Sequence, residues 1–171
     1  MKRILIIFTF FLLLSPAYLF SQEWNSIKTD KYSIDYPSDW EINEEGAMGT
    51  AFILFSPLKD GNSFRENINL MIQDLTGFDF DLDSYTELSE SQVGQYIQNA
   101  KILKSERLQG AAGEYHMIEY TGTQQEFNLH WKQYYWYIND KAYLLTFTAE
   151  DTAYEEYISL ANQIMNSFKL N

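Results

Sequence analysis

Cysteine is absent from all 171 residues of this chain. The chain therefore has no disulfide, no thiol nucleophile, no thiolate metal ligand and no cysteine for a lipid anchor. Basic residues are also scarce, since 12 Lys and Arg stand against 24 Asp and Glu and give a net charge of −12. Nucleic acids and anionic membrane surfaces are bound through basic patches, so we expect neither as a partner.

Long hydrophobic runs are missing as well, with one exception at the N-terminus. Two basic residues precede an apolar run from Ile4 to Leu14, and the segment that follows contains the small residues Ser15, Ala17 and Ser21. A basic start, a short apolar run and a small-residue exit are typical of a secretory signal peptide. A membrane-spanning helix needs about 20 apolar residues, more than this segment provides. We expect residues 1–21 to be removed by cleavage after Ser21, with cleavage after Ala17 as the alternative.

Proline is rare, and residues 22–171 contain no repeat, low-complexity tract or linker. One domain is the expectation for such a segment, and cleavage of residues 1–21 would leave it without a stable membrane anchor. Export of a chain without cysteine favours a bacterial periplasm or the external medium as its location.

The remaining chain has the pattern of short strands and two helices. The expected strands are rich in aromatic or branched residues and are bounded by turn formers. They run over Trp24 to Lys28, Tyr32 to Tyr36, Ala51 to Ser56, Ile68 to Leu75, Lys101 to Arg107, Glu114 to Thr121, Phe127 to Ile138 and Ala142 to Thr148. Asn139 and Asp140 tolerate positive φ, so the last two strands should form a tight hairpin. Strands and helices do not alternate regularly, which predicts an α+β fold: a mostly antiparallel sheet of about six to eight strands with helices packed on it.

The final helix has the clearest pattern. Its apolar residues recur at helical spacing on one face: Tyr154, Tyr157, Ile158, Ala161, Ile164, Met165 and Phe168. Thr152 and Glu155 have the spacing of a capping box at its start. A second helix is expected from Ser84 to Gln98. Its inward residues would be Tyr85, Leu88, Val93, Tyr96 and Ile97.

Several short motifs resemble PsbP-like domains in their order and spacing. The first is the aromatic strand from Tyr32 to Trp40, which contains Pro37, and the sequence Phe55 to Pro57 follows. The later matches are Asn67 to Leu70, Ala142 to Phe147 and Asn166 to Phe168. Together they span nearly all of residues 24–170. Pro37 also has a structural role, because it cannot donate to a ladder and so ends its strand, after which Trp40 should fold onto the core.

The resemblance implies an α-β-α sandwich with a central antiparallel sheet and a non-enzymatic binding or assembly role. No site residue is carried over from the family. We expect no cofactor and no catalytic residue, because the chain lacks a serine nucleophile elbow and a phosphate-binding glycine loop. Gly110 to Gly113 instead has the composition of a turn between two strands.

Two histidines could take part in metal binding or acid–base chemistry. His116 and His130 lie on adjacent expected strands. Their side chains share a face only if the two residue numbers of each cross-strand pair add up to an even number. A zinc site would need a third ligand, for which Glu114 is the obvious donor.

The acidic segment before the second helix allows two interpretations. Asp79, Asp81, Asp83 and Glu90 fall on the acidic positions of a calcium-binding EF-hand loop, but Ser84 occupies the position that requires glycine. The other interpretation is helix capping by Asp81 or Asp83, with a capping box of Ser84 and Glu87 as the alternative cap. We favour capping and expect no metal.

The aromatic strand is the candidate contact region. Its members are Trp131, Tyr134, Tyr135, Trp136 and Tyr137, which alternate between the two faces of the strand. A sheet covered on both faces would bury these rings, whereas an open face would offer them to a partner or ligand. The first hypothesis is an exported module that contacts another envelope or secreted protein. The second is a carbohydrate or small-ligand binder, and a histidine-dependent hydrolase is third.

Overall fold

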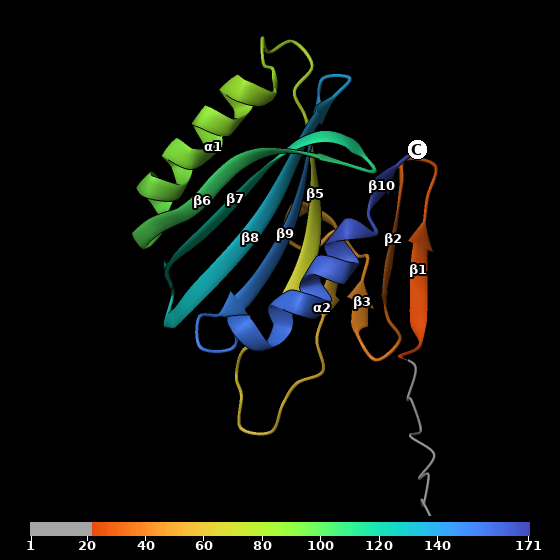
Figure 1. Cartoon of the computed structure of the whole chain (residues 1–171), viewed down its shortest axis with the longest axis vertical. Helices are drawn as coiled ribbons and strands as arrows, with labels where there is room; N and C mark the ends of the chain where they lie inside the picture. The colour runs from red at the N-terminus through yellow and green to blue at the C-terminus, as the bar shows by residue number, and fades with distance from the viewer. Residues whose placement is uncertain (1–21) are drawn as a thin grey trace, which may run out of the picture.

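The computed structural model describes residues 22–171 and contains two helices and ten strands within that range (Figure 1). The signal peptide predicted for residues 1–21 lies outside the described residues. The strands are β1 Trp24–Lys28, β2 Tyr32–Pro37, β3 Glu41–Asn43, β4 Thr50–Phe55, β5 Asn67–Asp74, β6 Gln98–Gly110, β7 Gly113–Gln124, β8 Phe127–Ile138, β9 Lys141–Glu150 and β10 Lys169–Leu170. The helices are α1 Leu82–Tyr96 and α2 Tyr154–Asn166, with a 3₁₀ turn η1 at Ala47–Gly49.

Seven strands form the main sheet, in the order β3-β4-β5-β9-β8-β7-β6. Every neighbouring pair in it is antiparallel. The predicted α+β class and antiparallel pairing are therefore confirmed. Strand β8, which carries the aromatic residues, lies inside the sheet between β7 and β9 and has no free edge.

A second sheet of three strands has the order β1-β2-β10. Strand β10, at the end of the described chain, pairs with β2, so Lys169 lies opposite Ser33. Ser167 strengthens this connection, because its hydroxyl accepts a hydrogen bond of 2.9 Å from the backbone N–H of Asp35. Strand β10 was not predicted, because two residues carry no pattern of their own.

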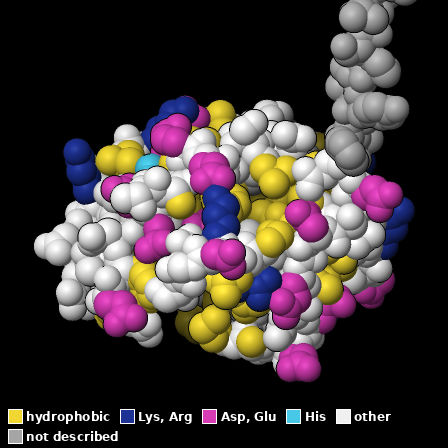
Figure 2. All heavy atoms as spheres, turned by 90° about the horizontal axis from the view of Figure 1, so that it is seen from below, with side chains coloured by type: hydrophobic (Ala, Val, Ile, Leu, Met, Phe, Trp, Pro, Cys, Tyr) yellow, Lys and Arg dark blue, Asp and Glu magenta, His cyan; other side chains and the backbone are white. Residues whose placement is uncertain are grey.

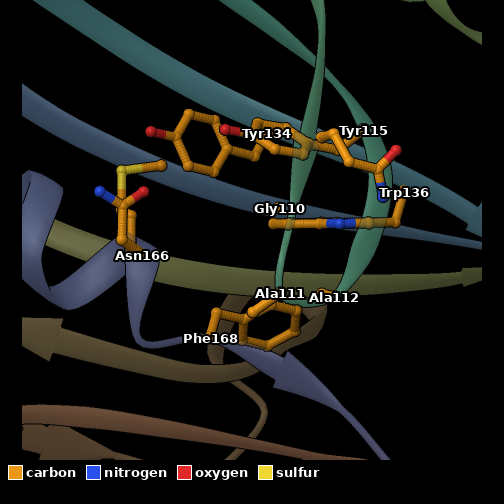
Figure 3. Close-up of a pocket in the computed structure, with 10 residues that line it drawn as sticks. Gly110, Ala111, Ala112, Tyr115, Tyr134, Trp136, Asn166 and Phe168 are labelled. Carbon is orange, nitrogen blue, oxygen red and sulfur yellow. The ribbon is translucent and has the colours of Figure 1, made fainter.

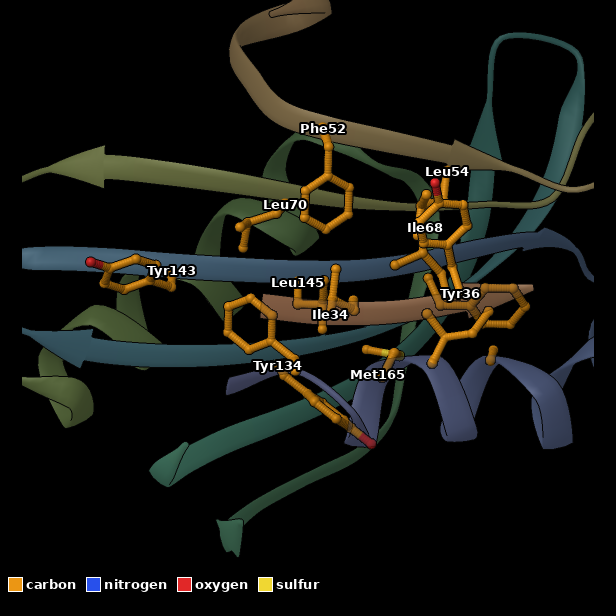
Figure 4. Close-up of a cluster of buried hydrophobic side chains, with 14 of the residues drawn as sticks. Ile34, Tyr36, Phe52, Leu54, Ile68, Leu70, Tyr134, Tyr143, Leu145 and Met165 are labelled. Atoms are coloured by element: carbon orange, nitrogen blue, oxygen red, sulfur yellow. The ribbon is translucent and has the colours of Figure 1, made fainter. Parts of the chain in front are cut away.

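The main sheet has an apolar core on each face. One core lies between the sheet, α2 and the small sheet, and Figure 4 shows Ile34 of β2 and Met165 of α2 directed toward Leu145 of β9. The other core lies beneath α1 and includes Tyr85, Ile118 and Tyr135. Helices therefore cover opposite faces of the sheet, as the resemblance implied.

The tight turns follow the local chemistry of the sequence. Asn139 and Asp140 have φ values of 51° and 56° and form the two-residue turn between β8 and β9, which confirms the predicted hairpin. Gly110 ends β6 and Gly113 begins β7 with φ of 97°, so this segment turns one strand into the next as expected. Pro37 is the last residue of β2, and the side chain of Trp40 is buried.

Helix α2 packs with the predicted face, but it does not start as predicted. Tyr154 and Ile164 of α2 are buried, and so is Phe168, which follows the helix. The capping box of Thr152 and Glu155 is wrong, because the N-cap is Ala153 and no side chain caps it. A backbone hydrogen bond from Ala153 to Glu150 closes a tight turn there, so the helix begins after that turn.

Helix α1 begins two residues earlier than predicted, and its inward face is narrower. Tyr85 and Val93 are buried as expected, with Thr86 beside them. Leu88 and Tyr96 were expected to face inward, but they are 41% and 71% exposed. The spacing of apolar residues did not show how wide the buried face of α1 is. In the structure α1 contacts the sheet along one narrow stripe. No helix within residues 22–171 is long and apolar enough to cross a membrane.

Strand β6 is longer than predicted and forms one edge of the main sheet. Its pairing with β7 is interrupted by two irregularities, between Gln98 and Lys101 and between Ile102 and Lys104. Bulges and lysines disfavour the addition of a further strand at an edge. The polar, exposed character of β6 explains why its ends were missed.

Candidate functional site

The five aromatic residues of β8 divide between the two faces of the sheet. Four are buried: Trp131, Tyr134, Tyr135 and Trp136 are 5%, 4%, 1% and 3% exposed. Tyr137 is half-buried. The four buried rings do not form an open stacking platform on the sheet, because helices cover both faces. Three of the five rings instead line two hollows beside the helices.

The first hollow is a groove between α1 and the sheet, with a volume of about 210 Å³. Tyr85 and Tyr135 meet in it edge to face, with ring centroids 5.8 Å apart. Three glutamine amides also line it, and the exposed ring of Tyr96 borders it. The glutamines are Gln73, Gln92 and Gln133.

Hydrogen bonds hold the inner wall of this groove in place. The Tyr85 hydroxyl donates to Gln73 Oε1 at 2.7 Å, and the Tyr135 hydroxyl donates to Gln133 Oε1 at 2.8 Å. Burial raises the pKa of Tyr85 to about 12 and raises that of Tyr135 well above its usual value. Both hydroxyls therefore stay protonated donors at neutral pH. The groove has an amide-rich, uncharged wall.

The second hollow lies on the opposite face, between the β6–β7 turn and the end of α2. Tyr134 and Trp136 line it together with Tyr115 and Phe168 (Figure 3). Sequence reasoning selected Tyr134 and Trp136 but missed Tyr115 and Phe168. Tyr115 lies in an ordinary aromatic strand, and Phe168 was assigned to the core.

The register of β7 and β8 separates the two histidines. His116 lies opposite Tyr135 and His130 lies opposite Thr121, so paired numbers have an odd sum. The rings therefore project from opposite faces and cannot share a metal ion or a substrate. Within residues 22–171 no group of three or more His, Asp or Glu side chains could hold a metal ion.

His116 lies beside Ser105 and Glu90 under α1. The Ser105 hydroxyl donates to a Glu90 oxygen, and its Oγ lies 2.7 Å from His116 Nε2. If Ser105 gives its one proton to Glu90, its oxygen can only accept from His116, which places the imidazole proton on Nε2. A nucleophilic serine requires the reverse arrangement, with the imidazole accepting the hydroxyl proton. The geometry around His116 therefore does not support the hypothesis of a histidine-dependent hydrolase.

His116 should make stability depend on pH. Burial, followed by the positive charge of Arg107, lowers the pKa of His116 from 6.5, against the opposing effect of Glu90, Asp83 and Glu106. The unfolded chain then binds the proton at a higher pH than the folded protein, so stability is lost as pH falls below 6.5.

Urea unfolding midpoints at pH 7.5 and pH 5.0 test this expectation in the wild type and in His116→Gln. The variant cannot gain the proton, so its midpoint should change less between the two pH values. An equal change in both proteins would contradict the lowered pKa.

His130 occupies a separate setting beside α2. Its Nε2 lies 3.0 Å from Glu119 Oε1, and its Nδ1 lies 3.4 Å from Asp151 Oδ1. The ring stacks on Tyr154 at an interplanar angle of 5°. These contacts connect the start of α2 to the sheet.

The acidic segment before α1 forms a helix cap. Asp81 is the N-cap residue, and its Oδ1 accepts a 2.8 Å hydrogen bond from the backbone N–H of Ser84. The Ser84 hydroxyl accepts in turn from the backbone N–H of Asp81 at 2.9 Å. The cap is therefore Asp81, not Asp83, and the alternative box that begins at Ser84 and ends at Glu87 is not formed, because Ser84 is the third residue of the Asp81 box.

We expect no calcium-specific stabilisation at this segment. A site with a dissociation constant one-hundredth of the calcium concentration would add about 2.7 kcal/mol. Thermal melts in calcium and in magnesium at equal ionic strength should therefore coincide. Asp81→Ala should cost about 0.5–2 kcal/mol in either salt. A rise seen only with calcium and lost in Asp81→Asn would contradict the capping role.

Charge is distributed over the surface without a single-sign block on the face shown in Figure 2, where acidic side chains lie among basic and apolar ones. Several acidic side chains are paired with basic ones. Arg107 contacts Asp83, and Lys141 lies 2.9 Å from Asp74. Such exposed pairs contribute little to stability, typically about 0–1 kcal/mol.

The fold is an α+β sandwich with a helix on each face of an antiparallel sheet. The sequence matches the PsbP family model over residues 23–170, so the chain belongs to the PsbP family. The resemblance drawn from the sequence motifs is thus confirmed. No curated protein matches the chain in sequence.

Solved structures share this fold at low sequence identity. Cyanobacterial PsbP (CyanoP) from Synechocystis sp. PCC 6803 superposes with a TM-score of 0.66 at 16% identity, over 93% of this chain and 99% of that one. LpqN of Mycobacterium tuberculosis, described as involved in cell envelope biogenesis, gives 0.68 at 12% identity, over 87% and 91%. PA94 of Pseudomonas aeruginosa, of unknown function, gives 0.61 at 13% identity, over 84% and 94%. At these identities the likeness concerns the fold alone.

Proposed function

We propose that this protein is an exported, non-enzymatic binding or accessory module that acts by contact with another envelope or secreted protein. The signal-like segment at residues 1–21 and the absence of cysteine support export. Membership of the PsbP family and the likeness to LpqN, whose description places it in cell envelope biogenesis, are consistent with such a role. Intact mass of the exported protein tests the location, and it should correspond to a chain that begins at Gln22.

The groove beside α1 is the proposed contact surface. Tyr96 is 71% exposed at its border, and tyrosine is enriched among residues that dominate binding energy at protein interfaces. The exposed amide of Gln92 can donate and accept hydrogen bonds, which matches the peptide groups of an extended segment. The amides of Gln73 and Gln133 already accept from Tyr85 and Tyr135, and each has a second N–H beyond the one that it donates within the protein. The partner we propose therefore inserts an extended segment along α1.

Site-directed photo-crosslinking in the native envelope tests this surface. A benzophenone side chain in place of Tyr96 should give one dominant adduct with an exported protein. The same group in place of Met48, which is 83% exposed but lies in η1, serves as the control and should not give that adduct. No adduct at position 96, or the same adduct at both positions, would contradict the proposal.

Two further variants separate the groove from the helix surface in general. Gln92→Trp places a large ring in the groove and should reduce the adduct several-fold. Gln95→Trp adds the same ring to an exposed position of α1 that does not line the groove, so it should leave the adduct unchanged.

A further inference from the structure

The register of the small sheet brings Gln22, the first described residue, beside an acidic side chain. Strand β1 pairs antiparallel with β2 (Figure 1). Beyond that ladder the backbone N–H of Ser38 donates a 2.9 Å hydrogen bond to the backbone oxygen of Glu23. One residue further along, the same register places Gln22 opposite Asp39. The two side chains meet there, because Gln22 Nε2 donates a 3.2 Å hydrogen bond to Asp39 Oδ1.

Gln22 is also the residue that the expected cleavage would make N-terminal. Removal of residues 1–21 by a cut after Ser21 would give Gln22 a free α-amino group. An N-terminal glutamine carries an amine and a carboxamide that can close a five-membered lactam. In that reaction the amine nitrogen attacks the side-chain carbonyl carbon Cδ. Glutamine inside a chain cannot react in this way, because its nitrogen is part of a peptide bond.

The local structure leaves room for this ring to close. Strand β1 begins at Trp24, so Gln22 lies outside the ladder, and its side chain is exposed. It borders a hollow of about 280 Å³ that is also lined by the β2–β3 turn and by α2. The carboxamide is therefore held by its bond to Asp39 and not by packing, and rotation of the side chain can bring Cδ to the backbone nitrogen of the same residue.

Ring closure requires two proton transfers, and Asp39 is placed to carry them. The bond between the amine nitrogen and Cδ forms, the bond between Cδ and Nε2 breaks, and ammonia leaves. The amine must lose one proton, and Nε2 must gain one. A carboxylate that accepts the proton of the amine can deliver it to Nε2, as general base and then general acid. The 3.2 Å between Asp39 Oδ1 and Nε2 lies within the reach that such transfer needs, about 2.6–3.2 Å.

We propose that the exported chain converts Gln22 into pyroglutamate without a separate enzyme, and that Asp39 is the catalytic general acid–base in this step. The proposal rests on the export and the cut after Ser21 proposed above. It is a single reaction within one chain, so the protein remains a non-enzymatic module after it. The lactam has no free amine, which protects the terminus from aminopeptidases in the envelope or medium.

The rate of ammonia loss tests the proposal. The chain of residues 22–171, which contains every described element, is released from a fusion partner with Gln22 first. Its intact mass is followed at pH 8, where about half of the α-amino groups are neutral. It should lose the mass of one ammonia at least tenfold faster than a synthetic peptide of residues 22–28, which lacks Asp39. In denaturing urea the same chain should react only at the rate of the peptide.

Two matched variants assign the effect to the carboxylate. Asp39→Asn keeps an oxygen that can accept from Gln22 Nε2 but cannot carry the proton, so it should also react at the rate of the peptide. Asp30→Asn makes the same change in the β1–β2 turn, at the other end of the small sheet, and should react like the wild type. A folded chain no faster than the peptide, or Asp39→Asn as fast as the wild type, would overturn the proposal.

The mass of the exported protein separates this inference from the export on which it rests. Expression of the full chain should give a product that begins at Gln22 and lacks one ammonia, which supports both. A product that begins at Gln22 and keeps the ammonia would overturn the cyclisation alone. A product that retains residues 1–21 would overturn the export and the cyclisation together.

Discussion

Phe168→Ala is expected to lower the free energy of unfolding by about 3–5 kcal/mol, the usual cost of removing a buried phenylalanine ring. Phe168 is 2% exposed and lies where three elements meet. Its ring stacks on Tyr32 of β2 at 6.0 Å and contacts Trp136 of β8 at 5.0 Å. The substitution therefore weakens the contact between the end of α2, the small sheet and the main sheet at once. Urea unfolding followed by tryptophan fluorescence measures the loss.

Phe78→Ala provides the control for this experiment. Phe78 is 63% exposed in the loop before α1, so its truncation should change stability by about 0.5 kcal/mol or less. A loss below about 1 kcal/mol for Phe168→Ala would mean that the ring does not connect the three elements.

Gly122→Ala should destabilise the protein by about 1–3 kcal/mol, the range for overpacking a filled interior. Gly122 lies in β7 beneath the segment that joins α1 to β6. An added Cβ would lie 2.4 Å from Ile97 Cγ2 and 3.0 Å from the backbone oxygen of Gln98. The Ile97 methyl group must therefore shift, and the backbone oxygen of Gln98 must give by a few tenths of an ångström. Denaturant unfolding measures the loss of stability. The near-ultraviolet circular dichroism of Tyr120 and its neighbours reports the change in packing.

Gly94→Ala is the opposite case and the natural control. Gly94 lies in the exposed part of α1, and an added Cβ there would meet nothing within 4 Å. Alanine in place of glycine inside a helix stabilises by about 0.5–1 kcal/mol. The same substitution should thus raise stability at position 94 and lower it at position 122. Changes of the same sign would show that the packing of α1 differs from that described.

The elements predicted best are those with strong local chemistry. Strand β8 has the predicted bounds, from Phe127 to Ile138, because its aromatic run and the Asn139–Asp140 turn are local signals. The face of α2 was predicted for the same reason, since helical periodicity is contained in the helix itself. Strands β3 and β10 have three and two residues, which is too short for any periodicity to appear.

The features missed depend on contacts between distant residues. The faces of His116 and His130 follow from one register choice, and the sequence permits both registers equally. The aromatic cavity requires Phe168, near the end of the chain, to lie beside the turn at Gly110, and no local pattern reveals that contact. Trp136 was selected only as a member of an aromatic strand, without the neighbours that make it part of a cavity.

The inward face of α1 was misjudged for a related reason. Leu88 and Tyr96 were placed inward because they are hydrophobic and recur at helical spacing. Hydrophobicity alone does not indicate how wide a stripe of a helix the sheet can cover. That width depends on how α1 lies across β6, β7 and β8, which is a property of the assembled fold.

The pairing of β10 with β2 affects when the fold can be completed. Residues 169–170 form the third strand of a sheet whose other two strands lie at residues 24–37, so nearly the whole described chain separates them. Chains emerge from the ribosome N-terminal end first, and contacts between such distant segments form late. The third strand of the small sheet can therefore pair with β2 only after nearly all of the described chain has been synthesised, so this pairing is a late step in folding.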